Sequence, residues 1–422
     1  MTLLFVNATQ VVTCAGPGRA RRGAEMRDAG VLQEGAVAVT GDRIVAVGSQ
    51  SELDRQFPAA TRIDCGRGVL TPGLVDSHTH AIFGRSRADE QEQRAAGADY
   101  LAIAAQGGGI HASVRDLRAR SEDELTALAR ARLLRLGAYG TTTVEIKSGY
   151  GLTVEDELKT LRVIARLSEV LPLRLVPTWL GAHEIPLEHR ATPLGRRAYV
   201  DLLIHEMLPR VAAERLATFA DVFCEPGVFT VEETRTILRA ARGAGLALKL
   251  HADELAPSGG AELAVELGAT SADHLGTISA AGVAALAHAP TVATLLPGTM
   301  LFLGKTMQAP ARALIDAGAA VALATDFNPG TSPTPNLPLI LTLGVSQLRL
   351  SVAEVIVAAT VNGAAALGLA GETGQLAPGY CADLALFDIA DVRELPYWYG
   401  DRRCRATWAR GKACHQFDLP VP

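Results

Sequence analysis

Short apolar runs alternate with segments of helical character through the middle of the chain. Eight runs are apolar at successive positions, which is typical of strands buried on both faces of a parallel sheet. They lie at 73–80, 141–146, 173–180, 220–224, 246–252, 270–275, 291–296 and 321–326. Four of the intervening segments begin with a hydroxyl residue and an acid three positions later, a helix-start signal, at Ser121, Thr153, Thr230 and Ser351. The pattern predicts repeated strand–helix units.

The two ends of the chain show a different pattern, in which short strands alternate with glycine-containing turns. Such strands are predicted in roughly the first 70 and the last 50 residues. Neither end has enough strands for a stable sheet of its own, so we expect the two ends to fold together into one small β-sandwich domain. The predicted organisation is therefore 1–70 and 371–422 in the small domain, with 71–370 between them.

The middle segment has the alternation expected of an α/β protein with a (β/α)₈ barrel, and a doubly wound open sheet is the alternative. The placement of polar residues favours the barrel, because they gather at the carboxyl ends of the predicted strands. Barrel enzymes build their active sites at that end. The sequence therefore predicts a barrel with a site at its mouth.

Composition and charge narrow the classes of protein. The 422 residues are 48% hydrophobic with a formal net charge of −5, which is typical of an enzyme and gives no sign of nucleic-acid binding. The one basic cluster, Gly18–Arg27, is predicted to be a solvated loop. Six scattered cysteines without a CxxC pair indicate reduced thiols and a cytoplasmic protein. Neither a signal peptide nor a membrane-spanning run is predicted.

Histidines mark the candidate chemistry. His78 and His80 are separated by one residue, so on a strand both side chains point to the same face. His251, His274 and Asp326 stand at the ends of the fifth, sixth and eighth predicted strands, which a barrel brings together. Imidazoles and a carboxylate gathered in this way suit one hydrolytic metal ion with a position left for water. Separate, unrelated buried histidines are the alternative.

Several motifs resemble those of the metal-dependent amidohydrolase superfamily and, within it, the imidazolonepropionase family of histidine degradation. The broader likeness lies in "PGLVDSHTH" followed by two lone histidines and an aspartate. The narrower likeness lies in "HAIFGRSR", "EIKSGYGL", "LGAHEIP", "LHADEL" and "TDFNPGTSPTPNLP". The resemblance spans nearly the whole chain. It implies hydrolysis of the cyclic amide of 4-imidazolone-5-propanoate to N-formimidoyl-L-glutamate.

The same resemblance implies a set of site residues, one ion of zinc (Zn²⁺) or iron (Fe³⁺) in each subunit, and a homodimer. The implied metal ligands are His78, His80, His251 and Asp326. The implied substrate-binding residues are Arg87, Tyr150, His183, Glu254, Asn328, Gly330 and Thr331. The implied catalytic residues are Glu254, His274 and Asp326.

The chemistry of these side chains fits the implied roles. Arg87 offers a planar fork for a substrate carboxylate, and Tyr150 adds a hydroxyl donor, so with His183 they form a predicted anion clamp. Glu254 would order the attacking water or move its proton, and Asp326 would take a proton beside the metal. His274 would donate to the developing oxyanion. Either Glu254 or Asp326 could protonate the leaving nitrogen.

Two rival functions and two loops complete the predictions. One rival is another amidohydrolase that acts on a carboxylate-bearing heterocycle, as a cyclic amidase or an aminohydrolase; the other is a noncatalytic scaffold. The resemblance implies that a two-metal relative would have a bridging lysine at the end of the fourth predicted strand. No lysine is present there, which favours a single ion, and Glu225 there is given no role. The glycine-rich segment Gln106–Val114 is predicted to be either an active-site flap or a surface loop. Gly298–Thr306 is predicted to be a plain loop.

Overall fold

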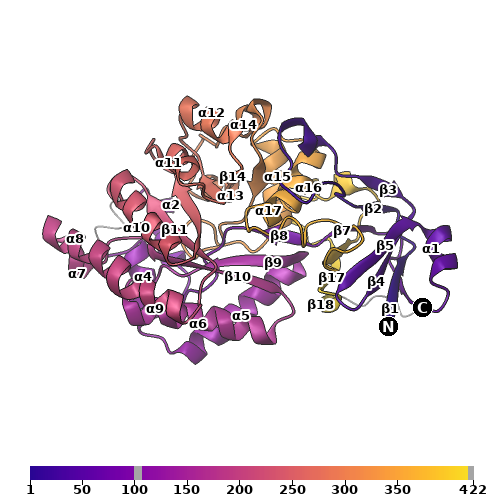
Figure 1. Cartoon of the computed structure of the whole chain (residues 1–422), viewed down its shortest axis with the longest axis horizontal. Helices are drawn as coiled ribbons and strands as arrows, with labels where there is room; N and C mark the ends of the chain where they lie inside the picture. The colour runs from indigo at the N-terminus through magenta and orange to yellow at the C-terminus, as the bar shows by residue number, and fades with distance from the viewer. Residues whose placement is uncertain (99–106, 417–422) are drawn as a thin grey trace.

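The computed structural model describes residues 1–98 and 107–416, and eight parallel strands form its central sheet (Figure 1). In chain order, which is also their order in the sheet, they are β8 (Leu74–Asp76), β9 (Thr141–Lys147), β10 (Arg174–Ala182), β11 (Phe219–Cys224), β12 (Ala247–Ala252), β13 (Ser271–His274), β14 (Val292–Leu295) and β15 (Val321–Leu323). The segments after the first and last strands close the barrel, because Thr79 pairs with Phe327 and the His80 N–H donates to the Phe327 carbonyl at 2.9 Å. The predicted (β/α)₈ barrel is confirmed.

Helices cover the outside of the barrel and several short ones line its rim. They are α2 (Ala88–Ala95), α4 (Ile110–Arg118), α5 (Glu122–Ala138), α6 (Val154–Val170), α7 (Leu187–Arg190), α8 (Pro193–Leu202), α9 (Leu208–Ala213), α10 (Val231–Gly243), α11 (Gly260–Glu266), α12 (Ala280–His288), α13 (Pro297–Phe302), α14 (Ala311–Ala317), α15 (Leu337–Ser346), α16 (Val352–Ala358) and α17 (Val361–Ala365), with a π-helical turn at Leu203–Met207. All four predicted hydroxyl caps accept a hydrogen bond from the backbone of the acid three positions on. Helix α10 is followed by Gly245 at φ 89°, a left-handed residue just past a helix end.

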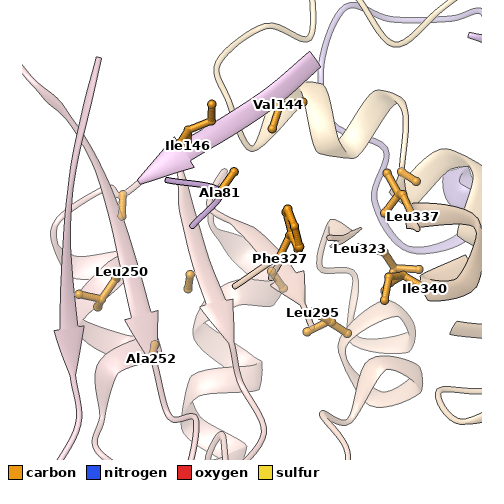
Figure 2. Close-up of a cluster of buried hydrophobic side chains, with 14 of the residues drawn as sticks. Ala81, Val144, Ile146, Leu250, Ala252, Leu295, Leu323, Phe327, Leu337 and Ile340 are labelled. Carbon is orange, nitrogen blue, oxygen red and sulfur yellow. The ribbon is translucent and has the colours of Figure 1, made fainter. Parts of the chain in front are cut away.

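The main hydrophobic core lies between the barrel strands and the surrounding helices. Figure 2 shows Val144 and Ile146 of β9, Leu250 of β12 and Leu323 of β15 together with Ile340 of α15. Their side chains are fully buried. The successive apolar positions of the strands supply this layer. It holds the strand ends, and with them the site, in place.

Strands from the two ends of the chain form a separate small domain beside the barrel, drawn in indigo and yellow in Figure 1. One sheet contains β1 (Thr2–Val6), β4 (Gly35–Thr40), β5 (Arg43–Ser49) and β6 (Thr61–Asp64); the other contains β2 (Gln10–Val12), β3 (Val31–Gln33), β7 (Val69–Pro72), β16 (Leu384–Phe387), β17 (Cys404–Ala409) and β18 (Lys412–Gln416). Helix α1 (Gln50–Gln56) and the 3₁₀ turn Val392–Glu394 complete it, while the 3₁₀ turn Gly23–Arg27 packs against the barrel helices α14 and α16. Phe5 packs edge-on against Trp408 with ring centroids 4.9 Å apart, which joins the two sheets. The two ends therefore fold together, as predicted.

The prediction of a solvated loop at Gly18–Arg27 is wrong. Arg21 is buried and donates to the Cys14 carbonyl, and the Arg22 guanidinium donates to backbone carbonyls of Leu286 and Ala287 in α12 and of Gly318 after α14. Carbonyls at a helix C-terminus lack partners within the helix, and an arginine can satisfy several of them at once. The cluster therefore anchors the N-terminal segment to the barrel.

Both glycine-containing loop predictions also differ from the structure. Residues Ile110–Arg118 form α4, whose first turn contains the buried His111, 3.3 Å from Arg190. Gly109, at φ 68°, takes the non-helical position before α4 without a side-chain cap, which is why no helix-start signal was visible. Gln106 lies outside the described residues. Pro297–Phe302 forms α13, with proline in its first turn. In the described parts of the chain, the structure contains no helix with the length and apolarity needed to span a membrane.

Candidate metal and substrate site

Four histidines and an aspartate meet at the carboxyl end of the barrel strands. The rings of His78 and His251 lie 4.5 Å apart between centroids, and those of His251 and His274 lie 5.1 Å apart. His78, His80 and His251 place one ligand atom each within 4.8 Å of one another. A second set that meets the same limit combines His78 and His274 with Asp326. The predicted residues therefore converge. His274, which was predicted to be catalytic and not a ligand, belongs to one of the two possible ligand sets.

The nitrogen atoms in this cluster have the free valences that a metal ion needs. Among the described residues, His78 Nε2 and His251 Nε2 are buried nitrogens without a hydrogen-bond partner. Burial lowers the pKa of His78, His80 and His274 well below the ordinary value, so their rings are neutral, the form that binds metals. Neutral imidazoles with unsatisfied nitrogens around one point fit a divalent or trivalent cation.

Buried carboxylates hold the other sides of two histidine rings. Asp273 Oδ2 lies 2.7 Å from His78 Nδ1, and Asp221 Oδ2 lies 2.9 Å from His251 Nδ1. Asp221 also accepts the backbone N–H of His251. The Asp273 carboxylate on His78 Nδ1 fixes the tautomer of that ring and directs Nε2 toward the metal position, while His251 Nδ1 contacts Asp221 closely without the angle of a hydrogen bond. Burial would raise the pKa of Asp221, but His251 and Lys147 beside it hold that pKa well below its usual range.

A charged layer inside the barrel supports these carboxylates. Lys147 Nζ lies 2.7 Å from both Glu145 Oε1 and Asp221 Oδ2, and all three side chains have no exposed surface. Burial alone would lower the pKa of Lys147, but the charges of Asp221, Glu145 and Asp273 raise it above its ordinary value. This layer was not predicted from the sequence. Its signal was present, because Glu145 and Lys147 are the two charged residues of β9, stand at alternate positions and face the barrel interior together.

Asp326 is held from two sides. The Thr299 hydroxyl donates to Asp326 Oδ2 at 2.6 Å, while Oδ1 faces His80 Nε2 at 3.5 Å and His78 Nε2 at 3.6 Å. Burial raises the pKa of Asp326 to about 6. Asp326 and His274 also have left-handed backbones, at φ 52° and φ 77°, which non-glycine residues adopt at an energetic cost. The strand ends are bent at the two positions where these side chains enter the site.

Glu254 lies next to His274. Its Oε2 is 3.5 Å from His274 Nε2, and burial together with the charges of Asp326 and Glu225 raises its pKa well above the ordinary value. Glu225, which the sequence analysis left without a role, accepts the backbone N–H groups of Glu254 and Ala256. It therefore fixes the turn that presents Glu254.

Arg87 faces the loop that follows β15. It is only 6% exposed, and its Nε and Nη2 both donate to Glu90 Oε2. A β-carbon on Gly330 would stand 2.2 Å from Arg87 Nη1, so only glycine fits there. The other oxygen of Glu90 accepts the backbone N–H of Gly109. Arg87 is thus a buried, paired cation and not a surface guanidinium.

Asn328 organises the same loop. Its side-chain oxygen accepts the backbone N–H groups of Gly330 and Thr331, and its amide donates to the Asp326 carbonyl at 2.7 Å. The amide also donates to the Thr331 hydroxyl. These bonds keep Gly330 against Arg87 and fix the backbone of Asp326.

The rings of His183 and Tyr150 lie beside His80. The His183 ring stacks on His80 with centroids 5.0 Å apart, and Tyr150 lies 5.4 Å from His183. His183 Nδ1 is 2.9 Å from the Gly149 carbonyl, so Nδ1 carries the proton and Nε2 is an acceptor. Burial lowers the pKa of His183 to about 3. His183 is therefore neutral, and the positive charge of the predicted anion clamp comes from Arg87 alone.

The barrel and the histidines and aspartate around one point agree with the family that sequence comparison gives, the amidohydrolases. The Amidohydrolase family model matches residues 90–415, and the model of the bacterial imidazolonepropionase-like composite domain matches residues 35–60. Solved structures below 25% identity support the same fold. They include a zinc-bound adenosine deaminase from Xanthomonas campestris (20% identity, TM-score 0.71, 97% of this chain and 92% of that one) and the ochratoxinase of A. niger (18%, TM-score 0.70, 99% and 96%).

Curated relatives narrow the family. The imidazolonepropionase of Solibacter usitatus is 45% identical over 98% of both chains, and that of Symbiobacterium thermophilum is 49% identical over 94% of this chain and 93% of its own. The imidazolonepropionase of Chloroflexus aggregans is 46% identical over 97% of both chains. The chain belongs to the imidazolonepropionase family.

Proposed function

We propose that this protein hydrolyses the ring amide of 4-imidazolone-5-propanoate to N-formimidoyl-L-glutamate in L-histidine degradation. One observation carries the proposal: similarity to imidazolonepropionases extends over nearly the full length of the chain. The buried Arg87 supports it, because a substrate with a propionate needs a fixed guanidinium, and Arg87 is held by Glu90 against Gly330, four residues after Asp326.

Each group of substrate-binding residues contacts a different part of the substrate. Arg87 binds the propionate through Nη1, since Glu90 occupies its other edge. Tyr150 adds a hydroxyl donor, and His183 Nε2 accepts a ring N–H, because its Nδ1 proton is held by Gly149. Gly330 and Thr331 line the carboxylate end on the loop that Asn328 maintains.

The catalytic residues surround the scissile amide. His78, His80, His251 and Asp326 would hold one ion of zinc or iron, which when bound supplies Lewis-acid activation at neutral pH. Asp326 and Glu254 move the proton of the attacking water to the departing ring nitrogen. His274 donates a hydrogen bond to the oxygen on which negative charge develops. Thr299 holds Asp326 Oδ2, so Oδ1 is the oxygen turned to the reaction.

An assay of the purified enzyme tests the proposal. We expect the imidazolone absorbance to decay with stoichiometric formation of N-formimidoyl-L-glutamate, and elemental analysis to give about one zinc or iron ion per chain. Ammonia release from nucleobases without imidazolone turnover would identify an aminohydrolase instead. A chain without metal and without turnover would identify the noncatalytic scaffold.

The proposal extends to the setting of the enzyme. We propose a cytoplasmic protein, because the six cysteines are all free and five are buried. We also propose a homodimer that binds neither nucleic acid nor membranes. Light scattering of the purified protein checks the dimer.

A further inference from the structure

Lys147 lies at the centre of the charged layer beneath the histidine cluster, and the proposed reaction does not use it. Its side chain has no exposed surface, and it contacts two acids at 2.7 Å. Burying an ammonium group is costly unless several partners compensate it. A hydrophobic side chain would fill the same barrel interior at lower cost, so the position of this charge requires an explanation.

Each acidic partner of Lys147 contacts a different part of the cluster. Asp221 lies on His251 Nδ1, and Asp273, whose Oδ2 is 3.8 Å from Lys147 Nζ, lies on His78 Nδ1. Glu145 accepts the backbone N–H of Thr79, the residue between His78 and His80, at 3.2 Å. One ammonium group therefore reaches all three histidines through three carboxylates.

We propose that Lys147 is a positioning residue of the metal site, which orients His251 and the segment from His78 to His80 by fixing Asp221 and Glu145. The inference rests on the proposed metal site. An ammonium group only donates hydrogen bonds, so it fixes one oxygen of each carboxylate that it binds. The carboxylate then fixes the ring that it contacts, and partners of this kind commonly change metal affinity by about 10- to 100-fold when they are removed.

A second buried lysine provides a matched control. Lys249 is also fully buried, but its Nζ bonds the Ser271 hydroxyl at 2.6 Å and the Ala366 carbonyl at 3.3 Å. It shares only Asp273 with Lys147, at 3.5 Å. If Lys147 served the stability of the barrel alone, the two lysines would behave alike in a metal-binding experiment.

The test measures the affinity for Co²⁺ in metal-free Lys147→Met and Lys249→Met proteins, in competition with a chelator of known affinity. We expect Lys147→Met to bind Co²⁺ about 10- to 100-fold more weakly, with altered visible absorption bands, and Lys249→Met to lose less than about threefold. Wild-type affinity in Lys147→Met, or equal losses in both variants, would overturn the inference. Failure of the wild-type protein to bind Co²⁺ would instead contradict the proposed metal site.

A double variant covers the case in which Lys147→Met does not fold. Glu145→Gln combined with Lys147→Met removes one charge of each sign, so the net charge of the buried layer is unchanged. Asp221 still loses its lysine, and we expect the same weakening of Co²⁺ binding by at least about tenfold. A folded double variant with wild-type Co²⁺ affinity would overturn the inference equally.

Discussion

The metal end and the carboxylate end of the site are built in different ways. At the metal end, His251 lies in β12 while His78, His80 and Asp326 follow directly after β8 and β15, and carboxylates from two other strands, Asp273 of β13 and Asp221 of β11, lie against the rings of His78 and His251. At the carboxylate end, Arg87 and Gly330 lie outside the strands, and bonds within one short segment hold each of them. Support from several strands suits the fixed geometry of an ion, and locally held loops suit a feature that differs between substrates. The difference separates residues for chemistry from residues for specificity.

The largest expected effect is at the metal end. His251→Ala should remove the ion and lower kcat by at least about a thousandfold, because a bound ion supplies several kcal/mol of transition-state stabilisation. Metal analysis and steady-state kinetics of the folded variant check this. Retention of one ion per chain would contradict the ligand assignment.

At the carboxylate end, Arg87→Ala should raise KM by about 10- to 100-fold with a smaller change in kcat, because charge-assisted hydrogen bonds contribute equally to substrate and transition state. Arg85→Ala is the matched control. Arg85 lies two residues earlier, is exposed, and pairs only loosely with Asp89 at 3.5 Å. An unchanged KM in Arg87→Ala would contradict the clamp. Equal increases of KM in both variants would show that positive charge in this region, and not Arg87 in particular, attracts the substrate.

A pH experiment tests whether His183 is neutral in the folded protein. The pKa of His183 is about 3 in the native protein and 6.5 when unperturbed. Between these values the unfolded chain binds the extra proton, so stability is full above pH 6.5 and falls as the pH decreases toward 3. Urea unfolding of the metal-free protein should show this loss, and His183→Gln should reduce its slope by up to about 1.4 kcal/mol per pH unit. The same change at the exposed His288 is the control; an equal effect there would contradict the explanation.

The smallest expected effect sharpens the link between the loop and Arg87. Gly330→Ala places a β-carbon against the guanidinium, and we expect KM to rise about fivefold, the lower range of overpacking costs. Gly371→Ala, where a β-carbon meets no atom within 4 Å, should leave KM unchanged. A Gly330→Ala enzyme with normal KM would show that Arg87 can shift without losing the substrate.

Much of this arrangement could be predicted from residue order. Alternating apolar runs and hydroxyl caps predicted the barrel, and the strand ends placed His251, His274 and Asp326 together. Lys147 and Asp221 were missed, because single charged residues within apolar strands were treated as part of the apolar pattern. The roles of Glu90 and Asn328 depend on hydrogen bonds within folded segments, and no periodicity records these bonds. The neutrality of His183 depends on burial, which is a property of the assembled site.

The helix ends satisfied by Arg22 have a consequence for protein engineering. The segment around Arg22 therefore supports the barrel helices, although it precedes the barrel in sequence. A shortened enzyme that starts at the first barrel strand would expose the carbonyl ends of two helices on the side away from the active site. Affinity tags belong before residue 1, and trimming the N-terminal segment should yield an aggregation-prone barrel and not a minimal catalyst.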